Sequence, residues 1–422
     1  MTEKTGVRRE TADANHRRVT MSRPASFWLM AGIWALGVFV ATAPSPLYRV
    51  YQAQLGFSTI TLTVIFAVYA IAVLVTLLVF GSVSDYVGRR PVIVAALAVN
   101  MGGCALFLVA HSVGVLIAAR VLQGVAVGAG DGALGAAMID LQPSGSSLAS
   151  VANSAGNSLG QGTGALCAAL LAQYAPAPTQ LIWWLLLALL AVAVVWVLVM
   201  PEPGTRRPGV LGSLRPRVGV PRPALAMFLI ATPCLIAAFA LSGFFLSLGP
   251  SLVLHIVGSS NLVWGGLVIF LLTGVAGVAT VAAARVPARA ALLAGCVLLF
   301  AGTAITFASI VTASGAGLLA GTAVAGVGFG LGFLGAVRVV SALAPPGQRA
   351  ALVAALWIVN FLAFSVPALI AGWAVTRYGL HRTSLVYCVV IAALAAVAAA
   401  SIVVRVRARS RARRAPATVS GS

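Results

Sequence analysis

The amino-acid sequence predicts an all-α membrane protein with twelve transmembrane helices in two related six-helix bundles. Of its 422 residues, 61% are hydrophobic and only 8% are charged. The mean hydropathy of +1.05 is too high for a soluble chain of this length. Charged or Pro/Gly-rich breaks separate twelve apolar stretches, and each is close to the roughly 20 residues that a helix needs to cross a bilayer.

The predicted spans follow these apolar stretches in order. They cover residues 26–48, 59–80, 92–110, 114–139, 149–172, 180–200, 224–248, 262–284, 290–310, 316–338, 351–373 and 383–404. Residues 201–223 are rich in proline and arginine, which indicates a linker between the sixth and seventh spans. The predicted organisation is therefore a tail over 1–25, a bundle over 26–200, a linker over 201–223, a bundle over 224–404 and a tail over 405–422.

The distribution of charge predicts the orientation in the membrane. The chain has 27 Lys and Arg residues against 7 Asp and Glu residues. Only Arg49, Arg120, Arg377 and Arg382 fall outside the tails, the linker and the alternate loops. Basic residues gather on the cytoplasmic side, so both termini are expected there, in a bacterial inner membrane. The lipid bilayer is the expected partner. Nucleic acid is not, because aromatic residues do not interleave with the basic ones.

Two long segments indicate that the halves are related. Residues 116–131 align with residues 318–333 at an offset of 202 residues, with one leucine and three glycines in common. After one inserted residue, Asn157 aligns with Asn360. Duplicated halves predict a substrate site near the midplane between them. The alternative is a chance match between two helices rich in glycine and alanine.

The loop after the second span carries a recognisable motif, Gly81-x-x-x-Asp85-x-x-Gly88-Arg89-Arg90. Glycines permit a chain reversal there, and Asp85 is expected to cap a helix or to pair with an arginine. The motif resembles the loop between spans 2 and 3 of major facilitator superfamily transporters at all five key positions. That resemblance implies a cytoplasmic gate that latches the halves together and stabilises the outward-open state.

The fourth span contains the one acidic residue that lies well inside a predicted span, Asp131. A charge at this depth is costly and usually functional, which favours a proton carrier. The alternative is a hydrated carboxylate near the inner end of the span. Arg120 lies about 16 Å away on nearly the same helix face.

Arg120-x-x-Gln123-Gly124 resembles the span 4 motif whose arginine is linked to proton transfer in exporters. In span 5, Ala165 replaces the proline of drug–proton antiporters, so this branch is matched only in part.

Several aromatic and polar residues are candidates for lining a substrate cavity. They are Arg49, Gln123, Asn157, Phe329, Phe333, Trp357, Asn360 and Phe361. Most lie on predicted spans 10 and 11, which favours a largely apolar pocket in the second half. Each aromatic residue alone is more typical of packing, and Arg49 alone is more typical of an interfacial side chain. The sequence contains neither a nucleotide-binding loop nor a metal-ligand spacing, so no cofactor or metal is expected.

These features together predict a secondary active transporter rather than an enzyme. The preferred hypothesis is proton-coupled efflux of a small, largely apolar compound, with Asp131 as proton carrier and Arg120 tuning it. An alternative is proton-coupled uptake of a small anionic metabolite bound by Arg49 and Arg120. A third is a non-transporting membrane protein built on the same scaffold. A monomer is expected, as is usual in the family that the motifs resemble.

Overall fold

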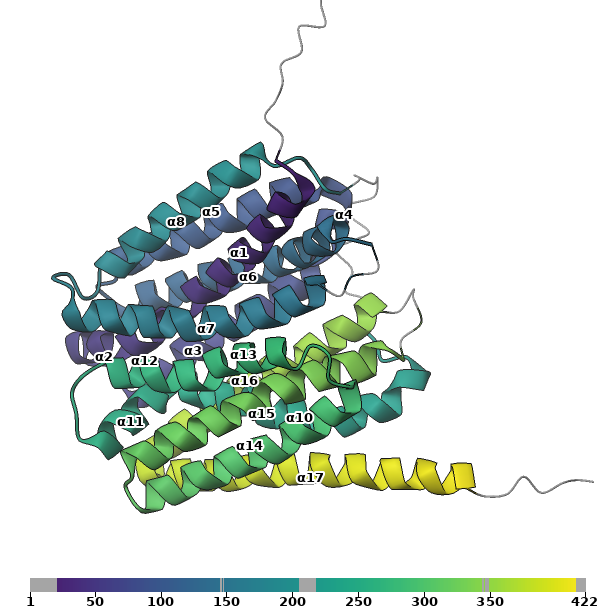
Figure 1. Cartoon of the computed structure of the whole chain (residues 1–422). Coiled ribbons are helices and arrows are strands. Elements are labelled where there is room, and N and C mark those ends of the chain that lie inside the picture. Colours follow the sequence, from purple (N-terminus) through teal and green to yellow (C-terminus); the bar gives the residue numbers. More distant parts are fainter. Residues whose placement is uncertain are drawn as a thin grey trace, which may run out of the picture.

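The computed structural model describes residues 21–144, 146, 148–204, 218–343, 345 and 349–414. Within this part the chain forms twelve long helical segments and no strand. Figure 1 shows how these helices are arranged. The first half contains α1 (Arg23–Thr42) with α2 (Pro44–Leu55), α3 (Thr59–Phe80), the short α4 (Ser84–Val87), α5 (Arg89–Leu108), α6 (Val113–Leu141), α7 (Leu148–Tyr174) and α8 (Leu181–Val199). The second half contains α10 (Arg222–Ser247) with α11 (Gly249–Val257), then α12 (Val263–Ile269), η1 (Phe270–Gly274) and α13 (Val275–Ala282) in one segment, and α14 (Ala288–Val311), α15 (Gly315–Ser341), α16 (Arg349–Tyr378) and α17 (Leu380–Arg414).

The predicted all-helical membrane fold is confirmed. Eleven of the helical segments are long and apolar enough to cross a bilayer by themselves. The twelfth, α7, is less apolar because it is rich in glycine, serine, asparagine and glutamine. It contacts α1 in its own half and the segment from α12 to α13 in the other half. Its polar composition is thus compatible with a place between other helices, and the chain is a multi-pass membrane protein.

The first span of each half consists of two helices separated by a break. The predicted spans 26–48 and 224–248 did not include such a break. Helix α1 ends at Thr42, just before Pro44, and α10 ends at Ser247, just before Pro250. A proline has no amide hydrogen to continue a helix, so the chain bends at these positions. In both halves the helix after the break ends at a glycine in the left-handed conformation, Gly56 or Gly258.

These breaks and caps give physical support to the sequence repeat. Gly56 and Gly258 are 202 residues apart, the offset of the aligned segments. Ser112 and Ser314 have the same separation, and each serine hydroxyl caps the N-terminus of α6 or α15. Equivalent positions in the two halves therefore have the same structural role, which is to end a helix or to cap one.

The predicted tail over 405–422 begins inside a helix. Helix α17 continues to Arg414, ten residues beyond the predicted end of the last span at residue 404. No glycine or proline interrupts the sequence between Leu380 and Arg414, and arginine and alanine are good helix formers. Loss of hydropathy ends the membrane span without ending the helix.

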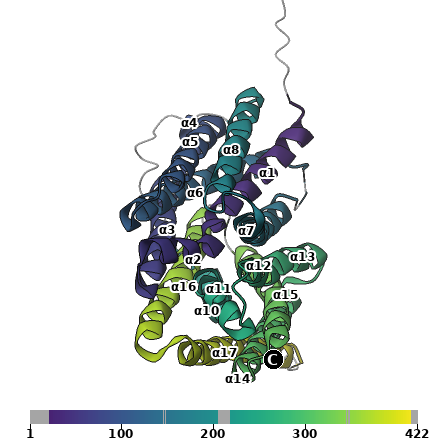
Figure 2. The same cartoon turned by 90° about the vertical axis from the view of Figure 1, so that its left-hand side faces the viewer.

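The long helices run between two faces of the molecule. We call the end that holds residues 81–90 the motif face and the end that holds Gly56 and Gly258 the pocket face; they lie on the right and left of Figure 1. Figure 2 views the pocket face and shows the first half above the second. The halves meet where α7 contacts the segment from α12 to α13 and where α3 contacts α16.

Several contacts hold the halves together near the pocket face. The backbone amide of Leu262 donates to Gln173 Oε1 at 2.9 Å. Asn261 Nδ2 donates to the hydroxyl of Tyr174 at 3.2 Å. The rings of Phe66 and Phe364, from α3 and α16, lie 4.8 Å apart. The first two contacts lie at the pocket-face end of α7 and at the start of α12, and the ring contact lies deeper, at the middle of α16, so the halves are joined from the pocket face inward.

Candidate functional site

The loop motif forms a network of charges at the motif face. Arg89 pairs with Asp85, as one of the predicted alternatives stated, and its Nη1 donates to Ser84 Oγ at 2.9 Å. The same guanidinium contacts Asp140, at the end of α6, with 3.3 Å between Nε and Oδ2. These partners all belong to the first half. The predicted latch between the halves is therefore not among these contacts, and it stays a prediction.

A carboxylate from the end of α8 caps the start of α5. Glu202 accepts a hydrogen bond from the backbone amide of Arg89 at 2.7 Å and from that of Arg90 at 3.1 Å. Because the first amides of a helix have no partner within the helix, this carboxylate acts as a cap supplied by another segment. Gly88, with φ of 108°, makes the reversal that brings the amides to Glu202. Gly81 lies in the turn that follows α3, but its φ of −58° is one that any residue adopts, so the reversal there does not depend on glycine.

Gly81 has a packing role instead. A side chain on Gly132 of α6 would collide with the carbonyl oxygen of Gly81. The small residues let α6 lie directly against the end of α3, as is common where helices pack in lipid.

Arg120 is buried in the first half, with 1% of its surface exposed. Its Nη1 donates to the carbonyl of Ala41 at 2.7 Å and to Gln123 Oε1 at 2.8 Å. Its guanidinium also lies over the ring of Tyr69, with 4.1 Å between Cζ and the ring centroid, a cation–π contact. Arg120 forms no ion pair with a carboxylate in the described part of the chain.

Arg120 and Gln123 both donate hydrogen bonds to backbone carbonyls at the break between α1 and α2. Pro44 cannot donate to the carbonyl of Val40, and Gln123 Nε2 lies 3.4 Å from that oxygen. Arg120 donates to the next carbonyl, that of Ala41. Two side chains of α6 thus satisfy buried carbonyls that the broken helix leaves open. This explains in physical terms why an arginine and a glutamine stand three residues apart here.

Asp131 is partly exposed and makes no hydrogen bond or ion pair within the described residues. Gly132 beside it packs on Gly81, which places Asp131 near the depth where α3 ends at the motif face. Gly135, one turn further along the same face of α6, lies beside Asn153 of α7. This face of α6 is therefore directed toward the neighbouring helix α7, inside the bundle.

The aromatic candidates of the second half form one continuous cluster. Phe239 of α10 lies 5.5 Å from both Phe329 and Phe333 of α15, measured between ring centroids. Phe333 lies 6.4 Å from Trp357 of α16, which lies 5.5 Å from Phe361. Three helices thus present a shared aromatic surface, of which Trp357 and Phe361 are partly exposed.

The polar candidates are distributed over both halves. Asn360 is 1% exposed, lies between Trp357 and Phe361 in sequence, and its Oδ1 has no hydrogen-bond partner. Asn157 is buried on α7. Gln123 is fully buried and engaged with Arg120. Asn360 thus shares α16 with Trp357 and Phe361, whereas Gln123 belongs to the buried arginine of the first half.

Arg49 lies apart from the other candidates. It is exposed on α2 and lines a cavity of about 660 Å³ at the pocket face. Neither Arg120 nor any residue of the aromatic cluster lines this cavity. The structure therefore does not place Arg49 with the remaining cavity candidates.

Two residues of these sites were missed by the sequence analysis: Asp140 and Glu202. The two carboxylates are among only 7 acidic residues in the chain, and each stands at the end of a predicted span on the side of the loop motif. That position next to an arginine-rich loop was a usable signal. The place of Tyr69 beneath Arg120 depends on how α3 packs against α6 and has no local signal.

The fold and the site define a class of protein: two related six-helix halves, joined in the membrane, with polar and aromatic residues between helices. The sequence matches the family model described as Major Facilitator Superfamily over residues 24–367. The chain belongs to this superfamily of transporters. A comparison with curated protein sequences gave no significant match.

Solved structures with a similar fold are also transporters. A bacterial homologue of the human lysosomal transporter Spinster, inward-facing and unoccupied, has a TM-score of 0.70 at 14% identity, covering 91% of this chain and 98% of that one. A mutant of the nucleoside transporter NupG has a TM-score of 0.68 at 12% identity, covering 89% and 99%. The human organic anion transporter MFSD10 has 0.64 at 18% identity, covering 90% and 100%. At these identities the likeness concerns the fold.

Proposed function

We propose that this protein is a secondary active transporter that exports a small, largely apolar compound in exchange for protons. The observation that carries the proposal is the aromatic cluster on α10, α15 and α16; Asn360, whose buried amide oxygen has no partner, lies on the same helix as Trp357 and Phe361. Aromatic walls with one or two polar groups are the usual lining of sites for small apolar ligands. No residue of this cluster is charged.

Alternating access follows from how the halves meet. The contacts at Gln173, Tyr174 and Phe66 join the halves from the pocket face inward. With the basic motif face in the cytoplasm, the described conformation is an inward-facing one. The likeness in fold to an inward-facing bacterial transporter supports this reading. In the opposite state the loop with Asp85 and Arg89 serves as the cytoplasmic gate.

Proton coupling is assigned to Asp131, with Arg120 tuning it. A carboxylate without a partner exchanges a proton without first breaking an ion pair. Its place near the motif face gives access to the cytoplasm in the inward-facing state. The protein then acts as a monomer in a bacterial inner membrane, with protons and the exported compound as its small partners and no bound cofactor.

The test is flux in reconstituted vesicles with an imposed pH gradient and a panel of apolar compounds. The Asp131→Asn variant is expected to bind the transported compound and to lose gradient-driven flux, because it keeps the size of the side chain and removes the titratable group. Gradient-driven flux at the wild-type rate in this variant would show that Asp131 is not the proton carrier.

The same vesicles separate the alternatives. Uptake of an anionic metabolite is favoured by Arg120, a buried cation that lacks a carboxylate partner within the described residues. It predicts inward flux of anions driven by the gradient. The separation of Arg49 from Arg120 weighs against one anion bound by both arginines. A non-transporting protein predicts no solute flux in either direction.

A further inference from the structure

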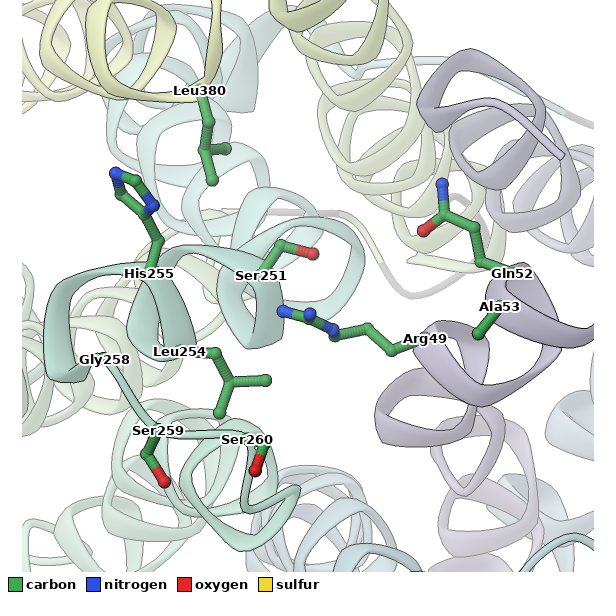
Figure 3. A pocket seen from close by; sticks show the side chains of 10 residues that line it. All are labelled: Arg49, Gln52, Ala53, Ser251, Leu254, His255, Gly258, Ser259, Ser260 and Leu380. Carbon is green, nitrogen blue, oxygen red and sulfur yellow. The ribbon is translucent and has the colours of Figure 1, made fainter. Parts of the chain in front are cut away.

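The cavity at the pocket face is built from both halves of the molecule. Arg49, Gln52 and Ala53 line it from α2 of the first half. The second half contributes α11, the segment after it and the start of α17: Ser251, Leu254, His255, Gly258, Ser259, Ser260 and Leu380. Figure 3 shows the Arg49 side chain extended from α2 toward Ser251 of α11.

The cavity lies where the two repeats face each other. The offset of 202 residues that relates Gly56 to Gly258 also relates Arg49 to Ser251. The same stretch of each half, after its proline break, therefore forms one wall. A ligand held here touches both halves at equivalent positions, unlike a ligand of the aromatic cluster, whose residues all belong to the second half.

The chemistry of the lining selects a negatively charged oxygen ligand. Arg49 makes no hydrogen bond or ion pair within the described residues. No acidic residue lines the cavity, and no Asp or Glu follows Glu202 in the sequence. Ser251, Ser259 and Ser260 also line the cavity, and Figure 3 shows Ser251 near the end of the Arg49 side chain, with Ser259 and Ser260 further away on the segment after α11. A guanidinium with hydroxyl donors is suited to a carboxylate or phosphate group.

We infer that this cavity binds a small oxyanion, a carboxylate or phosphate group that is free or part of a lipid headgroup, and that the anion bridges the two halves at the pocket face. A ligand that touches both halves favours the conformation in which they are packed together there. Bound anion therefore slows the transport cycle. This last consequence rests on the proposed function, whereas the binding itself does not.

Binding is tested on the purified full-length protein in detergent by thermal unfolding with increasing sodium phosphate. Sodium chloride at the same ionic strength corrects for screening. Phosphate is expected to raise the unfolding midpoint of the wild type in a saturable way. For the same shift, the Arg49→Gln variant is expected to need a phosphate concentration at least roughly tenfold higher, because a charged hydrogen bond is lost. Arg377→Gln, an exposed arginine at the end of α16 outside the cavity, is the matched control and keeps the wild-type response.

A second arm separates the two sources of the anion. The unfolding midpoint is measured in nanodiscs of phosphatidylcholine with and without phosphatidylglycerol. Stabilisation by phosphatidylglycerol that requires Arg49, without a response to free phosphate, assigns the ligand to a lipid headgroup. If neither phosphate nor phosphatidylglycerol gives stabilisation that depends on Arg49, the inference is wrong. Binding that persists in a protein without solute flux removes the proposed function and leaves this site intact.

Discussion

Replacing Gly162 with alanine tests whether close packing of α7 against η1 holds the two halves together. A Cβ atom on Gly162 would lie 2.7 Å from the backbone nitrogen of Gly274 and 2.8 Å from its Cα. Carbon atoms in contact are normally about 3.5–4.0 Å apart, so the two backbones must separate by about 1 Å. No side chain can rotate away, because the atoms in contact belong to the backbone of the other half.

The cost of this overpacking is about 1–3 kcal/mol, and it applies only to the conformation in which these helices touch. The equilibrium between that conformation and one with separated halves should therefore shift roughly 5- to 150-fold toward separation. The assay is cross-linking between cysteines introduced at Gln173 and Leu262, whose side chain and amide are in contact across the halves. Native Cys167, which is exposed on α7, is first replaced by alanine. The rate of cross-linking should fall in the Gly162→Ala background.

Gly160 supplies a matched control two residues earlier on the same helix. A Cβ atom there would lie 2.5 Å from the carbonyl oxygen of Ala35, which belongs to the same half. Gly160→Ala should therefore lower the unfolding midpoint without changing the cross-linking rate. Equal cross-linking in the two variants would refute the assignment of Gly162 to the contact between halves.

Two further predictions concern the caps in the first half. Glu202→Ala removes the acceptor of the Arg89 and Arg90 amides and is expected to lower the free energy of unfolding by about 1–2 kcal/mol. Glu202→Gln is expected to have an intermediate effect. An unchanged urea unfolding curve for Glu202→Ala would contradict this prediction. Arg120→Met leaves the buried carbonyl of Ala41 without a donor and should cost about 2–3 kcal/mol. Arg120→Lys should recover part of this loss, and identical unfolding midpoints for the lysine and methionine variants would show that the charge adds nothing.

Much of the helical pattern was predictable because it depends on local sequence. For spans 3 to 6 the observed helix ends lie within about three residues of the predicted ones, since a run of apolar residues and its flanking breaks set the length. The pairing of Asp85 with Arg89 was also predictable, because opposite charges four residues apart in a short loop can reach each other. The aromatic cluster followed from side chains that share a helix face.

The breaks in the first and seventh spans could not be predicted from the local sequence. Pro44 and Pro250 are visible in the sequence, but an apolar run that contains proline is compatible with a kinked span or with its end. In the structure a second helix follows each break. In the first half, Arg120 and Gln123 satisfy the open carbonyls from a different helix.

The sequence by itself determined that this chain crosses a membrane many times as helices, that its halves are related, and which loop carries the family motif. These properties follow from hydropathy, helix-breaking residues and short-range spacing. Only the tertiary structure decided that Glu202 caps α5, that Tyr69 lies beneath Arg120, and that Arg49 stands in a cavity of its own between the halves. Each of these depends on which helices become neighbours in three dimensions, and that arrangement is set by packing over the whole molecule.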